Sequence, residues 1–203
     1  MKKRIKAVVF DADGVVIDSP SYFSVQYEKE FGVSSNVVQA FFRDKFQDCL
    51  VGKADLKEEL RPLLDDWKWR GTVEDLLDYW FKAEHYIDER MIDEIKRLKE
   101  LGIKCYLGTQ QEKYRTEYMK SNMGFDRIFD KIYSSAEIGH KKPDKKFFEF
   151  IHQDLGEIEG IKPAEIMFWD NEEVNVISAK KLGWQSFLYT TFDDFQKNVS
   201  RIK

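Results

Sequence analysis

KAVVFDADGVVIDS, at residues 6–19, is the stretch that decides the fold of this chain. A short apolar run from Ala7 to Phe10 ends on Asp11, and Asp13 follows at the next position that faces the same way in an extended chain. Two carboxylates at the exposed end of a buried strand are costly unless they bind a cation or carry out chemistry. The stretch therefore predicts a first strand with a functional site at its end. A plain Asp-x-Asp-Gly turn that closes the strand at Gly14 is the structural alternative.

The composition excludes several classes of protein. With 42% apolar and 34% charged residues among 203, the chain is typical of a globular protein. A net charge of −4 without a long basic run argues against a nucleic-acid partner. No apolar run is long enough for a membrane span, and the first is too short for a signal peptide. The two cysteines, Cys49 and Cys105, indicate no disulfide framework, so we expect a cytoplasmic protein.

From residue 88 onward the pattern alternates between helix and strand. Asp88 can cap a helix that Gly102 ends, and Asp144 can cap another. Apolar runs predict strands at 103–107, 131–134, 166–169 and 186–189, with helices between them. This alternation predicts an α/β fold with a doubly wound parallel sheet, a Rossmann-like core.

Residues 20–86 show helical periodicity only. Apolar residues recur at three-to-four spacing over 20–31, 35–49, 53–66 and 72–86, and glycines separate these segments. We therefore expect a small all-helical cap at 20–86, of about the size of a four-helix bundle, inserted into a core of 1–19 and 87–203. Its hinges should lie near 18–21 and 86–89.

Polar residues follow the predicted strands where each strand ends. Ligands of such sheets bind beyond the carboxyl ends of the strands, so these residues should converge on one rim. They are Asp11 and Asp13 after the first strand, Thr109 within CYLGTQQ, Lys142 within HKKPD, and Asp170 and Asn171 within IMFWDN.

This order of motifs resembles the haloacid dehalogenase-like (HAD) hydrolase superfamily, in particular its phosphatases with a helical cap after the first motif. DADGV is similar to the first motif, and Thr109 matches the second. Lys142 stands in the Lys-Pro-Asp setting of the third motif. WDNEEVNVISAKKLGW resembles the acidic fourth motif and its trailing helix. The resemblance covers essentially the whole chain.

The resemblance implies a role for each of these residues. Asp11 would be the nucleophile that forms an aspartyl-phosphate, and Asp13 would be the general acid and base. Dehalogenases of the superfamily lack the second acid, so Asp13 favours a phosphatase. Thr109 and Lys142 would hold the phosphoryl group. Gln110, after Thr109, and Lys53 of the cap are further candidates for substrate contact.

The implied cofactor is Mg²⁺, which prefers oxygen ligands. Asp11, the backbone carbonyl of Asp13 and the fourth motif would bind it. Here the sequence departs from the family, because Asn171 stands where the inner acid is usual. Either Asp170 or Asn171 could then be the ligand, and an amide carries no negative charge.

The sequence thus predicts a Mg²⁺-dependent hydrolase of a small phosphorylated metabolite. Sugar phosphates and similar molecules fit, because a helical cap closes over a small cavity. One alternative is a non-catalytic or regulatory HAD-like binding protein, which only Asn171 favours. Another is a phosphoryl mutase, or a phosphonate- or halide-cleaving member of the superfamily. The sequence leaves the substrate and the oligomeric state open.

Overall fold

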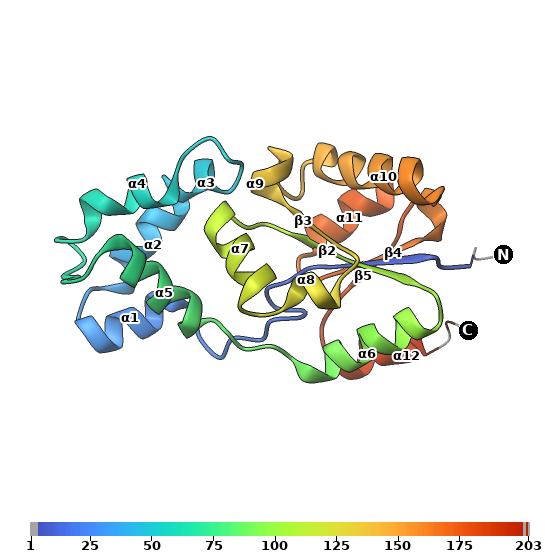
Figure 1. Cartoon of the computed structure of the whole chain (residues 1–203), viewed down its shortest axis with the longest axis horizontal. Helices are drawn as coiled ribbons and strands as arrows, with labels where there is room; N and C mark the ends of the chain where they lie inside the picture. The colour runs from blue at the N-terminus through green and yellow to red at the C-terminus, as the bar shows by residue number, and fades with distance from the viewer. Residues whose placement is uncertain (1–3, 201, 203) are drawn as a thin grey trace.

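The strands of the computed structural model, which describes residues 4–200 and 202, form one parallel sheet (Figure 1). The order β3-β2-β1-β4-β5 places β1 at the centre, between β2 and β4. Such a sheet presents the carboxyl ends of its strands at one edge, where ligands bind. The strands are β1 (Ala7–Phe10), β2 (Lys104–Thr109), β3 (Lys131–Ser134), β4 (Ile166–Asp170) and β5 (Gln185–Leu188).

Helices cover both faces of the sheet, because the side chains of β1 alternate between two apolar layers. Val8 and Phe10 belong to one layer, and Ala7 and Val9 belong to the other. The first layer contains buried residues of α6 (Glu89–Glu100), α7 (Lys113–Ser121), α8 (Phe125–Ile128) and α12 (Phe192–Val199). The second contains buried residues of α10 (Lys145–Glu159) and α11 (Glu173–Lys181). The predicted α/β class and doubly wound sheet are confirmed.

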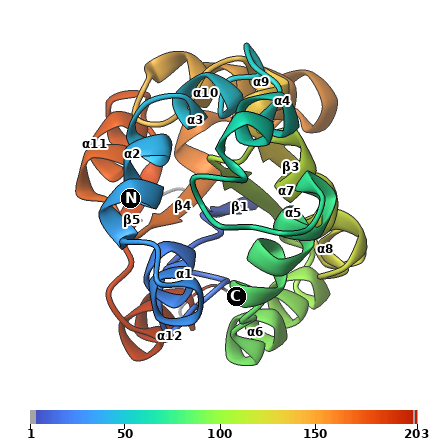
Figure 2. The ribbon, with the colours of Figure 1, turned by 90° about the vertical axis from the view of Figure 1, so that its left-hand side faces the viewer.

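A group of short helices lies beyond the carboxyl ends of the strands, at the left of Figure 1 and toward the viewer in Figure 2. It has its own apolar cluster, in which Phe23 stacks on Trp80 with ring centroids 5.3 Å apart. We call this group the cap. Its helices are α1 (Phe23–Phe31), α2 (Ser35–Arg43), α3 (Phe46–Cys49), α4 (Leu56–Leu60), the 3₁₀ helix Arg61–Leu63 and α5 (Val73–Ala83).

The cap helices are shorter than the periodicity predicts. The expected helix at 35–49 is interrupted at Asp44, whose backbone leaves the helical region, and continues as α3. The expected helix at 53–66 is the single turn α4, followed by the 3₁₀ turn that contains Pro62. Aromatic side chains at close to helical spacing pack around these breaks, so an apolar pattern persists where the helix does not.

The core elements agree more closely with the sequence. Asp88 and Asp144 cap α6 and α10 with their side chains, as predicted. The two other short elements of the core are the helix α9 (Ser135–Ile138), which follows β3, and a 3₁₀ turn (Pro163–Glu165), which precedes β4. No helix among the described residues has the length and apolar character needed to cross a membrane.

Candidate active site

Three neighbouring strands deliver the predicted acidic and hydroxyl side chains to one rim. Asp11 follows β1 directly, Thr109 is the last residue of β2, and Asp170 is the last residue of β4. Since β1 pairs with both β2 and β4 in parallel register, the three residues lie at adjacent strand ends. The rim predicted from the sequence therefore forms.

Lys142 joins two of these carboxylates. It lies in the loop between α9 and α10, and its Nζ is 2.8 Å from Asp11 Oδ1 and 2.6 Å from Asp170 Oδ2. The exposed fractions of the three side chains are 1% for Lys142, 12% for Asp11 and 0% for Asp170. Burial lowers the pKa of Lys142, but the charges of Asp11 and Asp170 raise it further, so the net shift is upward. The ammonium group therefore stays charged.

Asp170 is engaged on both oxygens. Oδ2 accepts from Lys142, and Oδ1 accepts from the backbone N–H of Glu172 at 2.8 Å and from Asn175 Nδ2 at 3.0 Å. Asn175 lies in α11, so this carboxylate ties the helix to the end of β4. The result is a fixed negative charge behind Lys142.

Asp11 has one engaged oxygen and one free oxygen. Oδ1 accepts from the backbone N–H of Ala12 at 2.7 Å and from Lys142. No hydrogen bond to Oδ2 is found among the described residues. Burial raises the pKa of Asp11 to about 7, against the opposing charge of Lys142.

The loop after β1 exposes Asp13. The carbonyl of Ala12 accepts from the N–H groups of residues 15, 16 and 17, so the chain wraps around it. Asp13 is exposed, and its Oδ2 accepts from the side-chain amide of Gln111. Desolvation of the carboxyl group by the surrounding protein raises the pKa of Asp13, and the positive charges of Arg115 and Lys142 oppose the shift.

Asn171 lies against the same loop. Gly14 has a φ of +78°, and a Cβ added there would clash with the side chain of Asn171. Glycine is thus required twice, for its left-handed backbone and for the close approach of the amide. The side chain of Asn171 therefore lies against Gly14, the residue that follows Asp13.

The oxygen atoms on this rim are suitable ligands for Mg²⁺. Their total negative charge is smaller than that of three carboxylates. The candidates are the Asp11 carboxylate, the Asp13 backbone carbonyl and the Asn171 amide oxygen. In the part of the chain that the structure describes, no three His, Cys, Asp or Glu side chains gather to hold a metal. Mg²⁺ commonly uses one or two carboxylates and completes its shell with water and phosphate oxygens.

Two buried polar atoms at the end of β2 are unsatisfied. Thr109 Oγ1 and Gln110 Oε1 have no hydrogen-bond partner within residues 4–200 and 202. Buried polar atoms are nearly always paired in folded proteins, so such atoms suit ligand contact. The hydroxyl can donate to an anionic oxygen, and the amide oxygen can accept from a hydroxyl group.

A cavity of about 460 Å³ opens between the cap and the core. Its cap wall includes Gln47, Asp48 and Lys53, and its core wall is residues 139–144, which include Lys142. The side chains of Lys141 and Gln47 bond across this opening. Lys53 thus shares a cavity with Lys142, although no contact joins it to Asp11 or Asp13.

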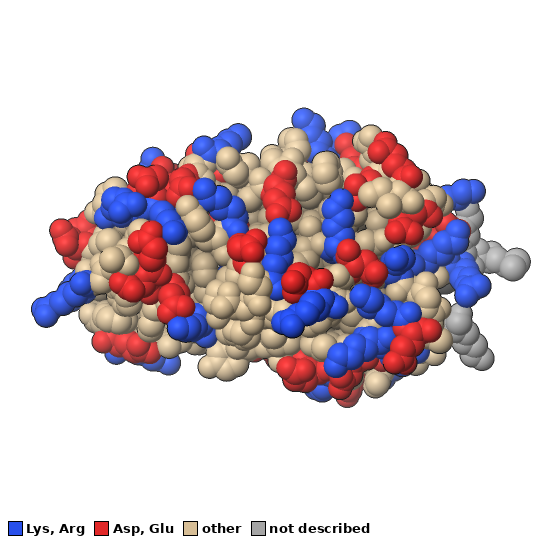
Figure 3. Space-filling model, viewed as in Figure 1, with Lys and Arg blue, Asp and Glu red and all other residues tan. Residues whose placement is uncertain are grey.

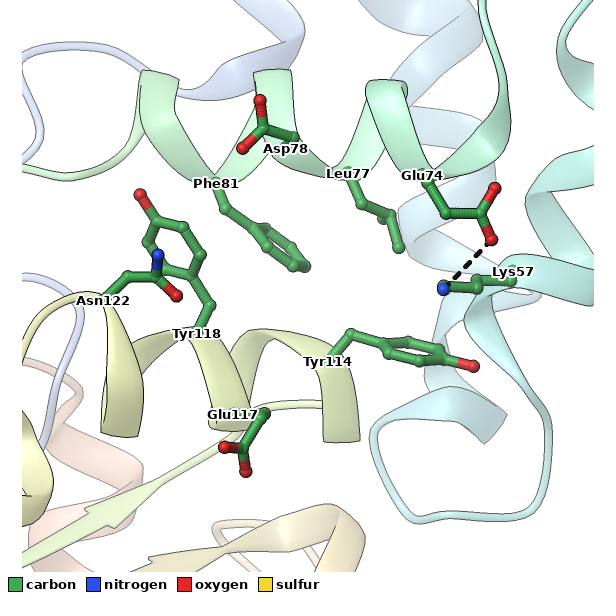
Figure 4. A pocket seen from close by; sticks show the side chains of 9 residues that line it. All are labelled: Lys57, Glu74, Leu77, Asp78, Phe81, Tyr114, Glu117, Tyr118 and Asn122. Carbon is green, nitrogen blue, oxygen red and sulfur yellow. Dashed lines mark ion pairs between the residues drawn. The ribbon is translucent and has the colours of Figure 1, made fainter.

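A second cavity, of about 310 Å³, lies between α5 of the cap and α7 of the core (Figure 4). Leu77 and Phe81 face Tyr114 and Tyr118 across it, and Lys57 pairs with Glu74 at one end. None of the predicted site residues lines it. It is a groove of the cap–core junction, and the rim of Asp11, Thr109 and Asp170 takes no part in its lining.

Two residues near the rim escaped the sequence analysis. Gln111 is 8% exposed and bonds Asp13; its place two residues after Thr109 was the one available signal. Arg115 is 2% exposed and donates to the carbonyls of Phe81 at 2.9 Å and Glu84 at 3.1 Å. Its partners lie 31 and 34 positions away, so no local pattern marks it.

Comparisons with known proteins agree with this geometry. A sequence profile of haloacid dehalogenase-like hydrolases matches residues 5–183. The D-ribitol-5-phosphate phosphatase of Bacteroides thetaiotaomicron is 26% identical over 210 residues, covering 98% of each chain.

Solved structures share the fold. A HAD family enzyme from Bacteroides thetaiotaomicron, in complex with magnesium and inorganic phosphate, has a TM-score of 0.80 at 21% identity and covers 96% of this chain and 98% of its own. A HAD-like hydrolase from Porphyromonas gingivalis has a TM-score of 0.78 at 23% identity, covering 98% of each chain.

Proposed function

We propose that this chain, which belongs to the haloacid dehalogenase-like hydrolase family, is a phosphatase that acts on a small phosphorylated metabolite through an aspartyl-phosphate. The observation that carries the proposal is the buried carboxylate of Asp11. It is held by Lys142 on one oxygen and left free on the other. A carboxylate fixed in this way at a strand end suits attack on phosphorus.

In the first half-reaction, Asp11 Oδ2 attacks phosphorus while the bond to the leaving oxygen breaks. Asp13 donates its proton to that oxygen, so the product leaves as an alcohol. In the second, Asp13 takes a proton from the attacking water, and the bond between phosphorus and Asp11 breaks. Lys142 and the Thr109 hydroxyl hold the phosphoryl oxygens in place during both steps.

The contacts favour Asn171 over Asp170 as the metal ligand of the fourth motif. Both oxygens of Asp170 are engaged within the protein, whereas Asn171 reaches the loop that carries Asp13. The Asp11 carboxylate and the Asp13 backbone carbonyl complete the protein's oxygen set. Bound Mg²⁺ would neutralise charge on the transferring phosphoryl group.

The substrate class follows from the cavity and from the relative. Three polar side chains of the cap, Gln47, Asp48 and Lys53, line one wall of the opening of about 460 Å³. A relative of nearly equal length is a D-ribitol-5-phosphate phosphatase. A phosphate ester of a sugar or sugar alcohol is the substrate we propose. Gln110 and Lys53 are the residues proposed to contact its hydroxyl groups.

The test is phosphate release from a panel of sugar and alditol phosphates, with Mg²⁺ and with EDTA. We expect Mg²⁺-dependent turnover of at least one ester, and a loss of roughly 10³-fold or more in Asp11→Asn. The variant should keep the far-UV circular dichroism of the wild type. If no ester releases phosphate, the non-catalytic reading replaces this proposal.

A further inference from the structure

Gln111 is a buried glutamine that the proposed mechanism does not use. Its backbone carbonyl accepts from Ser134 Oγ at 2.9 Å, Ser135 Oγ at 3.4 Å and the N–H of Ala136 at 3.3 Å. These donors lie where β3, the strand that neighbours β2 in the sheet, is followed by α9. The backbone from which this side chain projects is therefore fixed on several sides.

The side chain of Gln111 makes the two oxygens of Asp13 unequal. Its Nε2 donates to Oδ2, across 98 positions of sequence. No hydrogen bond to Oδ1 is found among the residues described, and Asp13 is exposed. One oxygen thus faces the protein, and the other is left for the substrate.

We propose that Gln111 is a positioning residue that determines which oxygen of Asp13 carries the proton. An N–H donor on Oδ2 favours the carbonyl form of that oxygen in the protonated acid, so the proton is held on Oδ1. From Oδ1 it passes to the leaving oxygen as the P–O bond breaks. Oδ1 then takes a proton from the attacking water. This inference rests on the proposed phosphatase function.

The structure also accounts for the choice of glutamine. The amide donates equally well to a carboxylate oxygen and to the carbonyl oxygen of a carboxylic acid. Asp13 alternates between these two forms during turnover, so a neutral donor can hold it in both. A lysine at the same place would favour the ionised form and would oppose Asp13 as an acid.

The experiment compares two esters that differ in their need for an acid. An alditol phosphate has an alkoxide leaving group that must be protonated, whereas p-nitrophenyl phosphate has a stable leaving group. In Gln111→Met we expect kcat/KM, which reports only the steps up to formation of the aspartyl-phosphate, to fall roughly 10- to 100-fold on the alditol phosphate. On the aryl ester it should stay within about threefold. Equal losses on both esters would overturn the proposal, because a purely structural defect does not distinguish leaving groups.

A double-mutant cycle tests whether Gln111 acts through Asp13. Asp13→Asn should show the same preference for the aryl ester in kcat/KM, and adding Gln111→Met should lower kcat/KM on the alditol phosphate no further. Additive losses contradict the proposal. If Gln111→Met folds poorly, Gln111→Asn replaces it. Its side chain is too short for the amide to reach Asp13, so we expect the same effect. Gln153→Met, on the surface of α10, is the matched control.

A measurement that does not depend on turnover tests the contact between Gln111 and Asp13 separately from the phosphatase function. If the wild type hydrolyses neither ester, the phosphatase function fails. The side-chain amide resonance of Gln111 in a ¹⁵N NMR spectrum still decides the contact. It should shift in Asp13→Asn, and an unmoved resonance would overturn the role of Gln111.

Discussion

Lys142 Nζ lies 2.6 Å from Asp170 Oδ2, and both side chains are almost completely buried. The carboxylate of Asp170 therefore holds the buried ammonium group of Lys142. Its other oxygen accepts from the backbone of Glu172 and from Asn175, which fixes it in place. Removing one partner of a buried ion pair strongly destabilises a protein, because the other charge is left buried and unpaired.

Asp170→Asn should therefore act on Lys142 rather than on the metal. We expect a loss of about 3 kcal/mol in the free energy of unfolding, because the pair loses its charge. The kcat should fall with it, while the Mg²⁺ concentration for half-maximal turnover stays within about threefold. Denaturant titration and Mg²⁺ titration of turnover measure the two effects. A large rise in the Mg²⁺ requirement would assign the ligand to Asp170 instead.

Asn171→Asp should have the opposite profile. It adds a carboxylate beside the loop that carries Asp13, so Mg²⁺ should bind roughly tenfold more tightly. The stability without metal should fall slightly, because like charges then approach each other. Isothermal titration with Mg²⁺ checks this, with Glu173→Gln in the exposed first turn of α11 as the matched control. Unchanged affinity would mean that Asn171 does not face the ion.

Glu112 should make stability depend on pH. It is 1% exposed, caps α7 by accepting from the N–H groups of Tyr114 and Arg115, and burial raises its pKa to about 7 from 4.5. Between these values the native state binds more protons than the unfolded state. The stabilisation contributed by Glu112 is therefore fully present below pH 4.5 and is lost as the pH rises through 7. The loss is on the order of 3 kcal/mol.

Glu112→Gln should remove this part of the slope, because an amide oxygen still accepts the two N–H groups but does not titrate. Urea unfolding at pH 5 and pH 7 measures it. The difference between the two pH values should shrink in Glu112→Gln and remain in Glu117→Gln, which lies exposed on the same helix. If the free energy of unfolding depends on pH equally in the wild type and both variants, Glu112 is not the group whose titration changes the stability.

Arg115 should hold the hinge side of the cap. Its guanidinium binds the carbonyls at the end of α5, and Glu84 binds the first N–H of α1 at 2.9 Å. Both connections between cap and core thus meet at Glu84, whose backbone carbonyl is held by the buried Arg115. Arg115→Met leaves carbonyls unpaired, each costing about 1–3 kcal/mol.

We expect Arg115→Met to expose residues 82–90 to trypsin, which can cut there after Lys82 or Arg90. Arg115→Lys should restore little, because a single ammonium group does not reproduce the planar fork. Arg127→Met, at an exposed position, should digest like the wild type. Equal digestion of all variants would contradict a hinge at this place, and the cap bounds of 20–86 would then need revision.

Local sequence predicted most of the core and the order of the site. The strand at 131–134 and the caps Asp88 and Asp144 depend on near neighbours in the chain, so periodicity and capping chemistry identify them. The convergence of Asp11, Thr109 and Asp170 followed from one rule, because parallel strands end on one edge.

Tertiary structure decided what those residues do to each other. The cap helices break at Asp44 and at the turn that contains Pro62, while apolar residues continue across the breaks, so a periodic pattern does not distinguish them from continuous helices. The pairing of Asp170 with Lys142 spans 28 positions, and that of Gln111 with Asp13 spans 98. Hydrogen bonds and ion pairs depend on distances of a few tenths of an ångström, which only the folded chain sets. The sequence by itself therefore determined that Asp11, Thr109 and Asp170 reach the rim, and the fold decided which oxygen atoms their partners hold.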